Sequence, residues 1–182
     1  MKSKIIFVVL TLLFSTPAKA DGSGGSDVGI AYGITVPDMP NTNPYDMWGV
    51  KGSTYIVSNF TIGGYYFMSR YQQGSQGIDF DFSIAGIEWA YHLTSGGGDT
   101  FFGVRAGLTK IHQNISNTDV IFSPYHYGVV LGYEFPLFSI VNLGFEGSYL
   151  HAEAASTTVN GTSYSEQKFG LVNFLATLTF KF

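Results

Sequence analysis

The sequence contains no cysteine among its 182 residues, which excludes disulfide bonds, thiolate metal sites, a cysteine nucleophile and a lipid-modified N-terminal cysteine. Charged residues are also scarce, at 12%. After residue 20 no run of 18 apolar residues occurs, which excludes a further transmembrane helix, because such a helix needs ~20 apolar residues. The whole chain is 45% hydrophobic and 16% aromatic, and it contains 23 glycines. That composition is too apolar for disorder and unlike a helical bundle.

The first 20 residues have the pattern of a removable export signal. Lys2 and Lys4 precede an apolar run at 5–14, and Ala18-Lys19-Ala20 offers the small residues that signal peptidase needs. We expect cleavage at about Ala20, with 1–20 removed and 21–182 forming one domain; a membrane-anchoring helix is the alternative, but the apolar run is too short. Losing three of the nine basic residues leaves six against 13 acidic ones, a net charge of −7. Such a chain is a poor partner for nucleic acid.

Apolar residues alternate along the rest of the chain with the period of a β-strand. At the C-terminus, Val172, Phe174 and every second residue up to Phe182 are apolar, whereas the intervening residues include Asn173 and Lys181. The same alternation predicts strands at 28–36, 47–57, 60–70, 85–93, 102–109, 127–135, 141–150 and 172–182. The boundary between the second and third strands rests on Ser58-Asn59, which suits a tight turn.

The connections between these strands alternate between short and long. We expect short turns at Ser58-Asn59, Ser95 to Asp99 and Pro136 to Ser139, and long polar loops at 37–46, 71–79, 113–124 and 155–167. Bacterial single-chain membrane barrels have even strand numbers, short periplasmic turns and longer external loops. The sequence therefore predicts an all-β fold, an eight-stranded antiparallel up-and-down transmembrane β-barrel (a meander).

Charge distribution indicates which face of each strand points inward. A soluble ligand-carrying barrel would turn its apolar face inward, so alternation alone does not decide. The face opposite the apolar one carries glycine and alanine, which suit a narrow interior, together with His92 and the polar side chains. We predict an interior polar network of Lys51, Glu88, Arg105, His126, Glu134, Glu146, Asn173 and Lys181.

Aromatic side chains supply a second indication. Trp89, Tyr91, Tyr133 and Phe135 occupy the apolar face near the ends of two strands that descend toward short turns, and Phe180 and Phe182 end the last strand in the same way. Aromatic girdles at the membrane interface are typical of transmembrane barrels. We therefore expect the apolar face to contact lipid.

Together, the signal sequence, the lack of cysteine, the alternating strands and the terminal Phe180-Lys181-Phe182 resemble the small OmpA/OmpX-type outer-membrane barrels, including the Ail-like and opacity-protein-like surface proteins. The resemblance covers the whole mature chain. It implies that Phe182, Phe180, Leu178 and Ala176 form the signal that the barrel-assembly machinery reads. It also implies the outer membrane of a Gram-negative bacterium as the location, with outer-membrane lipid and lipopolysaccharide as neighbours.

Glu88 and Arg105 flank the 95–99 turn at positions that place them directly across from each other. We predict an ion pair, because a buried charge without a partner is costly. A gated polar path or proton relay is the functional interpretation of such a pair. A structural plug is favoured, since eight strands leave no open channel.

The histidines are the other candidates for chemistry. Small outer-membrane barrels include lipid A deacylases, which place a His and a Ser two residues apart; here His151-Ala152-Glu153 has Glu153 at the serine position, which disfavours acyl transfer. No HxH or HExxH spacing occurs. We expect neither a metal site nor any other cofactor.

These observations predict a monomeric, non-enzymatic outer-membrane protein with a structural or surface role. The four long loops are the expected site of adhesion or of binding to an external ligand. Two alternatives stay open: a hydrolase that modifies lipid A, and a narrow passage for small apolar solutes.

Overall fold

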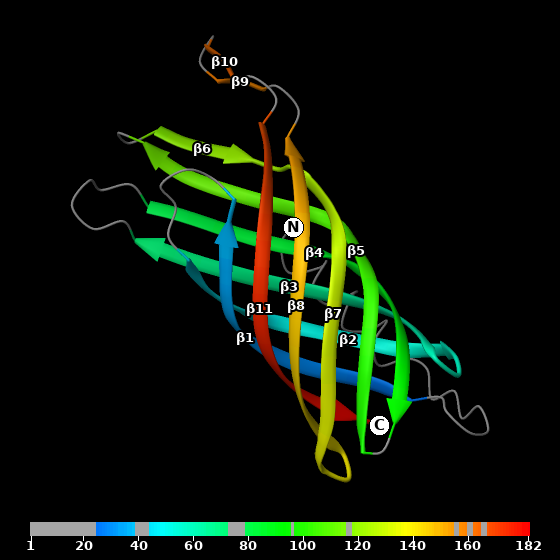
Figure 1. The fold of residues 1–182 in the computed structure, drawn as a ribbon. Coiled ribbons are helices and arrows are strands. Elements are labelled where there is room, and N and C mark those ends of the chain that lie inside the picture. The colour runs from blue at the N-terminus through cyan, green and yellow to red at the C-terminus, as the bar shows by residue number, and fades with distance from the viewer. Residues whose placement is uncertain are drawn as a thin grey trace.

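In the computed structural model, the chain forms a closed antiparallel β-barrel (Figure 1). The structure describes residues 25–38, 44–72, 79–95, 97–115, 118–154, 157–159, 162–164 and 167–182. Within these ranges no helix is long and apolar enough to cross a membrane. The expected signal segment at 1–20 lies outside the described residues.

Eight long strands build the barrel wall, and each pairs with the next along the chain until β11 closes on β1. The predicted meander is therefore confirmed. The barrel strands are β1 (Ser26–Pro37), β2 (Tyr45–Val57), β3 (Phe60–Gln72), β4 (Asp79–Ser95), β5 (Gly98–Ile115), β7 (Tyr125–Phe138), β8 (Val141–Ala154) and β11 (Gln167–Lys181). In Figure 1, β2 and β3 cross behind β7 and β8 at an angle, as strand tilt in a barrel requires.

Three short strands lie outside the wall itself. β6 (Thr118–Phe122) pairs back onto the end of β5. β9 (Thr157–Val159) and β10 (Thr162–Tyr164) form a small separate hairpin (Figure 1). The predicted loop at 113–124 is thus mostly strand. The predicted loops at 37–46, 71–79 and 155–167 contain segments that lie outside the described residues.

Two of the predicted short turns are shorter than expected. The turn at Ser58-Asn59 is confirmed, since β2 ends at Val57 and β3 begins at Phe60. The prediction for Pro136 to Ser139 is wrong: β7 continues to Phe138, and the register shift between Pro136 and Phe138 accommodates a proline that cannot donate a ladder hydrogen bond. The turn predicted at Ser95 to Asp99 is also shorter in the structure, because Asp99 already pairs as part of β5.

Gly97 lies in this narrow turn with φ of 114°. L-residues rarely adopt that backbone conformation, so glycine suits the reversal from β4 to β5. We call the end of the barrel with the three short turns the short-turn end and the opposite end the long-loop end.

Candidate functional site: the filled interior and the outer wall

Four charged side chains meet in the middle of the barrel interior. The Arg105 guanidinium donates from Nε to Glu88 Oε2 at 2.7 Å and from Nη2 to Glu146 Oε1 at 2.7 Å. The Lys51 ammonium donates to Glu146 Oε2 at 2.7 Å and lies 3.7 Å from Glu88 Oε1. Two cations and two carboxylates thus neutralise one another in the buried interior, where an unpaired charge would be costly.

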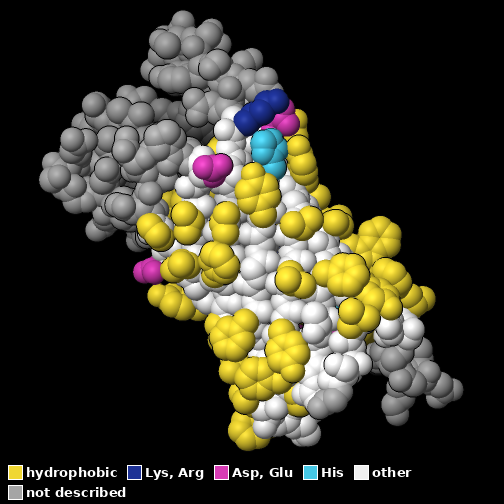
Figure 2. Space-filling view, in the orientation of Figure 1, with side chains coloured by type: hydrophobic (Ala, Val, Ile, Leu, Met, Phe, Trp, Pro, Cys, Tyr) yellow, Lys and Arg dark blue, Asp and Glu magenta, His cyan; other side chains and the backbone are white. Residues whose placement is uncertain are grey.

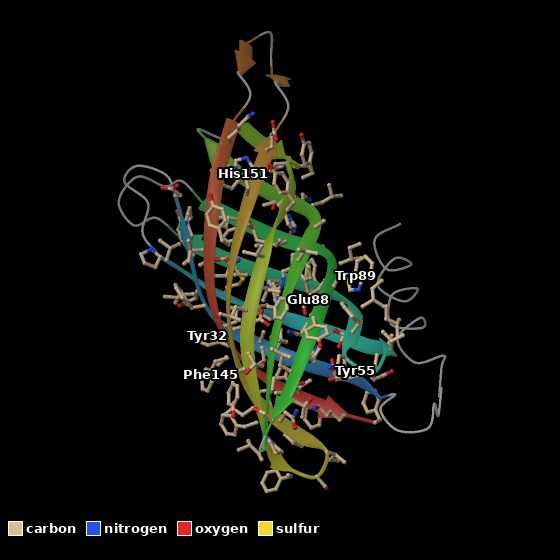
Figure 3. The ribbon with its side chains drawn as sticks, turned by 45° about the vertical axis from the view of Figure 1, so that its right-hand side comes forward. Tyr32, Tyr55, Glu88, Trp89, Phe145 and His151 are labelled. Carbon is tan, nitrogen blue, oxygen red and sulfur yellow. The ribbon has the colours of Figure 1, made fainter. Side chains whose placement is uncertain are left out.

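The predicted Glu88–Arg105 ion pair is present, and the two residues are direct cross-strand partners between β4 and β5. Neighbouring polar groups extend the cluster: Arg105 Nη1 and Asn173 Nδ2 both donate to the Ser148 hydroxyl, at 3.2 and 3.0 Å. The guanidinium carbon also lies 4.9 Å from the centre of the Tyr65 ring, within cation–π range. Arg105 is 1% exposed, so its charge is fully enclosed. Figure 3 shows Glu88 among the strands, whereas Tyr32 and Phe145 point away from them.

A second group of polar side chains fills the short-turn end of the interior. His92 Nδ1 lies 2.8 Å from Asp99 Oδ2, and the other ring nitrogen of His92 lies 3.0 Å from the Thr61 hydroxyl. Glu134 accepts from Asn142 Nδ2 at 3.3 Å and faces Asp99 directly across β5 and β7. Among the predicted interior residues, Glu134 therefore belongs to a different cluster from Glu88 and Glu146.

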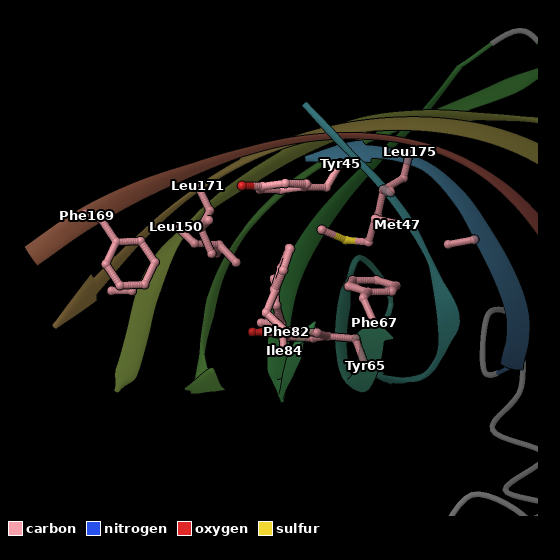
Figure 4. Close-up of a cluster of buried hydrophobic side chains, with 12 residues drawn as sticks. Tyr45, Met47, Tyr65, Phe67, Phe82, Ile84, Leu150, Phe169, Leu171 and Leu175 are labelled. Atoms are coloured by element: carbon pink, nitrogen blue, oxygen red, sulfur yellow. The ribbon is translucent and has the colours of Figure 1, made fainter. Parts of the chain in front are cut away.

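The long-loop half of the interior is filled by apolar and aromatic side chains, which the sequence analysis did not predict. Figure 4 shows this cluster beneath the ribbons of the barrel wall. Its buried members are Ala31, Tyr45, Met47, Tyr65, Phe67, Phe82, Ile84, Leu150, Ala152, Phe169, Leu171 and Leu175. A sequence signal existed, because Tyr45 and Met47 are in phase with Lys51 along β2, as Phe82 and Ile84 are with Glu88 along β4.

His126 lies at the boundary between this apolar cluster and the ion network. Its Nε2 is 2.6 Å from the Tyr65 hydroxyl and its Nδ1 is 2.9 Å from the Thr109 hydroxyl. Both ring nitrogens therefore have partners, and the histidine fills a structural place.

Some inward-facing glycines make room for large side chains on the neighbouring strand. The sequence analysis expected small side chains in a narrow interior, but the interior also holds aromatic rings beside these glycines. A Cβ at Gly132 would overlap the Phe101 ring, and a Cβ at Gly86 would overlap Tyr65. The interior has room for the Phe101 and Tyr65 rings because the paired residue on the neighbouring strand is a glycine, which has no side chain. At other inward glycines, such as Gly33 and Gly128, an added Cβ would instead meet a backbone carbonyl of the neighbouring strand.

Not every predicted interior residue joins the network. Lys51, Glu88, Arg105, His126, Glu134, Glu146 and Asn173 are buried. Lys181 is only half-buried at the end of β11, and no ion pair involving it is found among the described residues. Since β11 ends there, Lys181 lies at the rim of the barrel, away from the central ion network. Within the described part of the chain, no group of His, Asp and Glu is arranged to hold a metal ion.

The outward wall is apolar, and it carries the predicted interfacial aromatics. Trp89 and Tyr133 are exposed, and Tyr91 and Phe135 are partly exposed. Tyr91 contacts the rings of Phe60 and Phe102 on the adjacent strands. The predicted assembly signal faces the same way, with Ala176, Phe180 and Phe182 exposed and Leu178 half-buried. Figure 2 shows hydrophobic side chains spread over this surface, whereas soluble monomers rarely expose large contiguous apolar patches.

His151, which the sequence analysis weighed as a deacylase candidate and disfavoured, lies on this outer wall. The ring of His151 is 5.3 Å from that of Tyr127, and Glu153 forms an ion pair with Lys168 at 2.9 Å. The pattern therefore brings together a histidine, a carboxylate and a lysine, with Glu153 where acyl transfer would need a hydroxyl.

Comparisons with known proteins identify the fold. No protein-family model matches the sequence, and no curated protein does. Among solved structures, neisserial surface protein A is 13% identical with a TM-score of 0.60, covering 88% of this chain and 98% of its own. Ail of Yersinia pestis, crystallised with the heparin analogue sucrose octasulfate, is 12% identical with a TM-score of 0.62, covering 88% and 100%.

The N-terminal β-barrel domain of Pseudomonas aeruginosa OprF is 10% identical with a TM-score of 0.57, covering 88% of this chain and all of that domain. At these identities the likeness concerns the fold, and it extends over nearly the whole length of each relative. The predicted structural resemblance is confirmed: this chain has the fold of the small eight-stranded outer-membrane barrels.

Proposed function

We propose that this protein is a non-enzymatic, monomeric barrel of the outer membrane of a Gram-negative bacterium, with a structural or surface role. The observation that carries the proposal is the combination of an apolar outer wall with a filled interior. Large hydrophobic side chains such as Ile87, Leu131 and Phe174 are exposed around the wall. Lipid would cover them in a membrane, whereas water would not tolerate so large an apolar surface.

The filled interior supports a structural role over transport. A solute moving along the axis would meet the ion network of Lys51, Glu88, Arg105 and Glu146 and then the apolar cluster. Displacing either would break buried ion pairs or close packing, and both changes are costly. The narrow-passage alternative therefore requires a second interior arrangement.

The long-loop end is the proposed surface for contacts with an external ligand. The strands that the four long connections join end there, and loops on a rigid scaffold commonly carry binding. The names of two proteins with this fold, a neisserial surface protein and an attachment invasion locus protein, fit a surface role. The proposal also includes export with cleavage at about Ala20 and recognition of the C-terminal aromatic residues by the barrel-assembly machinery.

The first experiment compares the gel mobility of the purified mature chain, refolded in detergent, with and without boiling. A folded membrane barrel is expected to shift on boiling and to give a strand-type circular dichroism spectrum. Solubility in plain buffer without a shift would contradict the membrane proposal.

Two further measurements address the alternatives. Discrete conductance steps in a planar bilayer would contradict a filled interior. Loss of lipid A deacylation in a His151→Ala variant, relative to an active wild-type protein, would contradict the non-enzymatic assignment.

A further inference from the structure

Three buried carboxylates form an acidic cluster at the short-turn end of the interior. Asp27 is 8% exposed, and Asp99 and Glu134 are each 6% exposed. Asp99 and Glu134 are direct cross-strand partners between β5 and β7, and Asp27 interacts electrostatically with Glu134. Like charges directly opposite each other on one face of a sheet are destabilising. The acidic cluster therefore needs positive charge nearby.

The protein itself supplies little of this positive charge. Among the described residues, the acidic cluster forms a single ion pair, between His92 Nδ1 and Asp99 Oδ2 at 2.8 Å. The Lys51 ammonium interacts with Asp27, but it is held in the central ion network, 2.7 Å from its nearest carboxylate. Lys181 faces Asp27 across β1 and β11 and makes no ion pair in the described part of the chain. The central network is neutral by itself, whereas the acidic cluster sets three carboxylates against one histidine.

One carboxylate oxygen of the acidic cluster is buried without a partner. Asp99 Oδ1 accepts no hydrogen bond, whereas Oδ2 of the same carboxylate contacts both His92 and the Tyr55 hydroxyl. A buried carboxylate oxygen without a donor is costly. Glu134, directly opposite, is weakly held, because its two donors are neutral groups at 3.3 and 3.4 Å. These two facing carboxylates therefore keep free capacity for a positively charged ligand.

The acidic cluster lies near the mouth of the barrel at the short-turn end. Asp99 follows Gly97 of the narrow turn by two residues, and Tyr55 lies near the end of β2 (Figure 3). Arg105, in the central ion network, is six residues further along β5 than Asp99. A small ion that enters from the water at this end therefore reaches the acidic cluster without passing the central network.

We propose that the acidic cluster binds one hard divalent cation, Ca²⁺ or Mg²⁺, between Asp99 Oδ1 and the carboxylate of Glu134. Both ions prefer oxygen ligands, and Mg²⁺ usually keeps several waters and takes only one or two carboxylates. Such a site does not need a group of three His, Asp or Glu ligands, which is absent from the described residues. The cation supplies the missing positive charge and relieves the repulsion between β5 and β7. This site is separate from the long loops and goes beyond the proposed surface role.

Terbium luminescence provides a direct test of cation binding. Tb³⁺ is a hard cation that replaces Ca²⁺ at oxygen sites and emits light when a nearby tyrosine is excited, and the Tyr55 hydroxyl lies 3.5 Å from Asp99 Oδ2. The folded barrel is freed of metal with EDTA, transferred to a neutral detergent without phosphate groups, and titrated with Tb³⁺. We expect saturable emission that Ca²⁺ or Mg²⁺ displaces and that K⁺ at equal ionic strength does not.

Variants of nearly equal shape locate the bound ion. Glu134→Gln and Asp99→Asn each remove one charged ligand, and each should weaken Tb³⁺ binding about tenfold or more, since even the loss of an outer-shell partner costs ~10–100-fold in metal affinity. Asp46→Asn is the matched control, because Asp46 is exposed at the other end of β2, and it should leave the affinity unchanged. The gel-mobility shift on boiling shows whether each variant is folded.

Urea unfolding in the same detergent separates cation binding from a merely structural role of the carboxylates. In EDTA, Glu134→Gln should raise the urea midpoint above that of the wild type, because it removes the repulsion with Asp99. Added Ca²⁺ or Mg²⁺ should raise the wild-type midpoint and leave that of Glu134→Gln unchanged.

Two results would overturn the proposal. One is a wild-type midpoint that responds to neither Ca²⁺ nor Mg²⁺, which decides the question even if the variants fail to fold. The other is Tb³⁺ binding that is as tight in Glu134→Gln and Asp99→Asn as in the wild type. Either result would leave the proposed membrane location intact, since the boiling shift of the wild type tests that location separately.

Discussion

Replacing Arg105 with methionine should destabilise the barrel strongly, because this guanidinium balances the central ion network. Arg105→Met leaves Lys51 alone with the carboxylates of Glu88 and Glu146, so one buried negative charge has no counter-charge. Breaking a buried pair in this way costs about 3–5 kcal/mol. The methionine keeps most of the apolar volume, so the loss reports on charge more than on packing.

A double variant shows whether charge is the cause. Glu146→Gln removes the second carboxylate, and in the Arg105→Met background it leaves Lys51 facing only Glu88, at 3.7 Å. We expect the double variant to be more stable than Arg105→Met alone. The coupling free energy between the two positions should reach about 2–3 kcal/mol, near the upper end for residues in one network.

The assay is urea unfolding of the barrel in lipid vesicles, followed by tryptophan fluorescence and by the gel-mobility shift. Lys181→Met serves as the control, since Lys181 lies half-buried at the rim, and its removal should change the free energy of unfolding by less than about 1 kcal/mol. A loss below about 1 kcal/mol for Arg105→Met, or additive effects of the two central substitutions, would refute the reasoning.

Three further predictions concern the wall and the interior packing. Phe174→Arg should cost about 2–4 kcal/mol in the same vesicle assay if the site is near the bilayer midplane, and tolerance of the arginine would mean that the faces are reversed. Gly132→Ala should impair refolding yield, measured by the gel shift, because its Cβ would overlap the Phe101 ring, whereas the outward Gly64→Ala should refold normally. His126→Ala should lower the free energy of unfolding by about 1–3 kcal/mol, since it leaves two buried hydroxyls without their partner; an unchanged unfolding midpoint would contradict that role.

The barrel could be predicted from the sequence because its two determinants are local. Period-2 alternation assigns each residue to a face, and turn residues such as Ser58-Asn59 limit each strand. Once a turn is placed, residues at equal distances on its two sides become cross-strand partners. Counting outward from the 95–99 turn in this way predicts that Glu88 faces Arg105. The turn after β7 begins later than the sequence predicts, because an irregularity in the ladder after Pro136 lets the strand continue to Phe138.

The composition of the interior could be predicted only in part, since it depends on contacts between strands far apart in the sequence. Along β2, Tyr45 and Met47 face inward while Trp48 and Val50 face outward, so both faces are apolar and alternation does not separate them. Only the enclosed volume decides which large residues fit, and that volume depends on glycines of other strands, as Gly86 makes room for Tyr65.

The ion network therefore has a role that the apolar cluster cannot fill, which is to determine which face of the sheet points inward. If the two faces of the strands were exchanged, the outward apolar side chains would enter the interior and the inward apolar cluster would face lipid. At the long-loop end both faces are apolar, so this exchange would carry little penalty there. At the centre, however, the same change would expose Arg105 and Lys51 to lipid, at about 2–4 kcal/mol for each charge near the midplane. A slip of one residue in a strand has the same effect on that strand, because it exchanges its two faces. The four central charges thus favour one register over its neighbours, in addition to any contribution to the stability of the folded barrel.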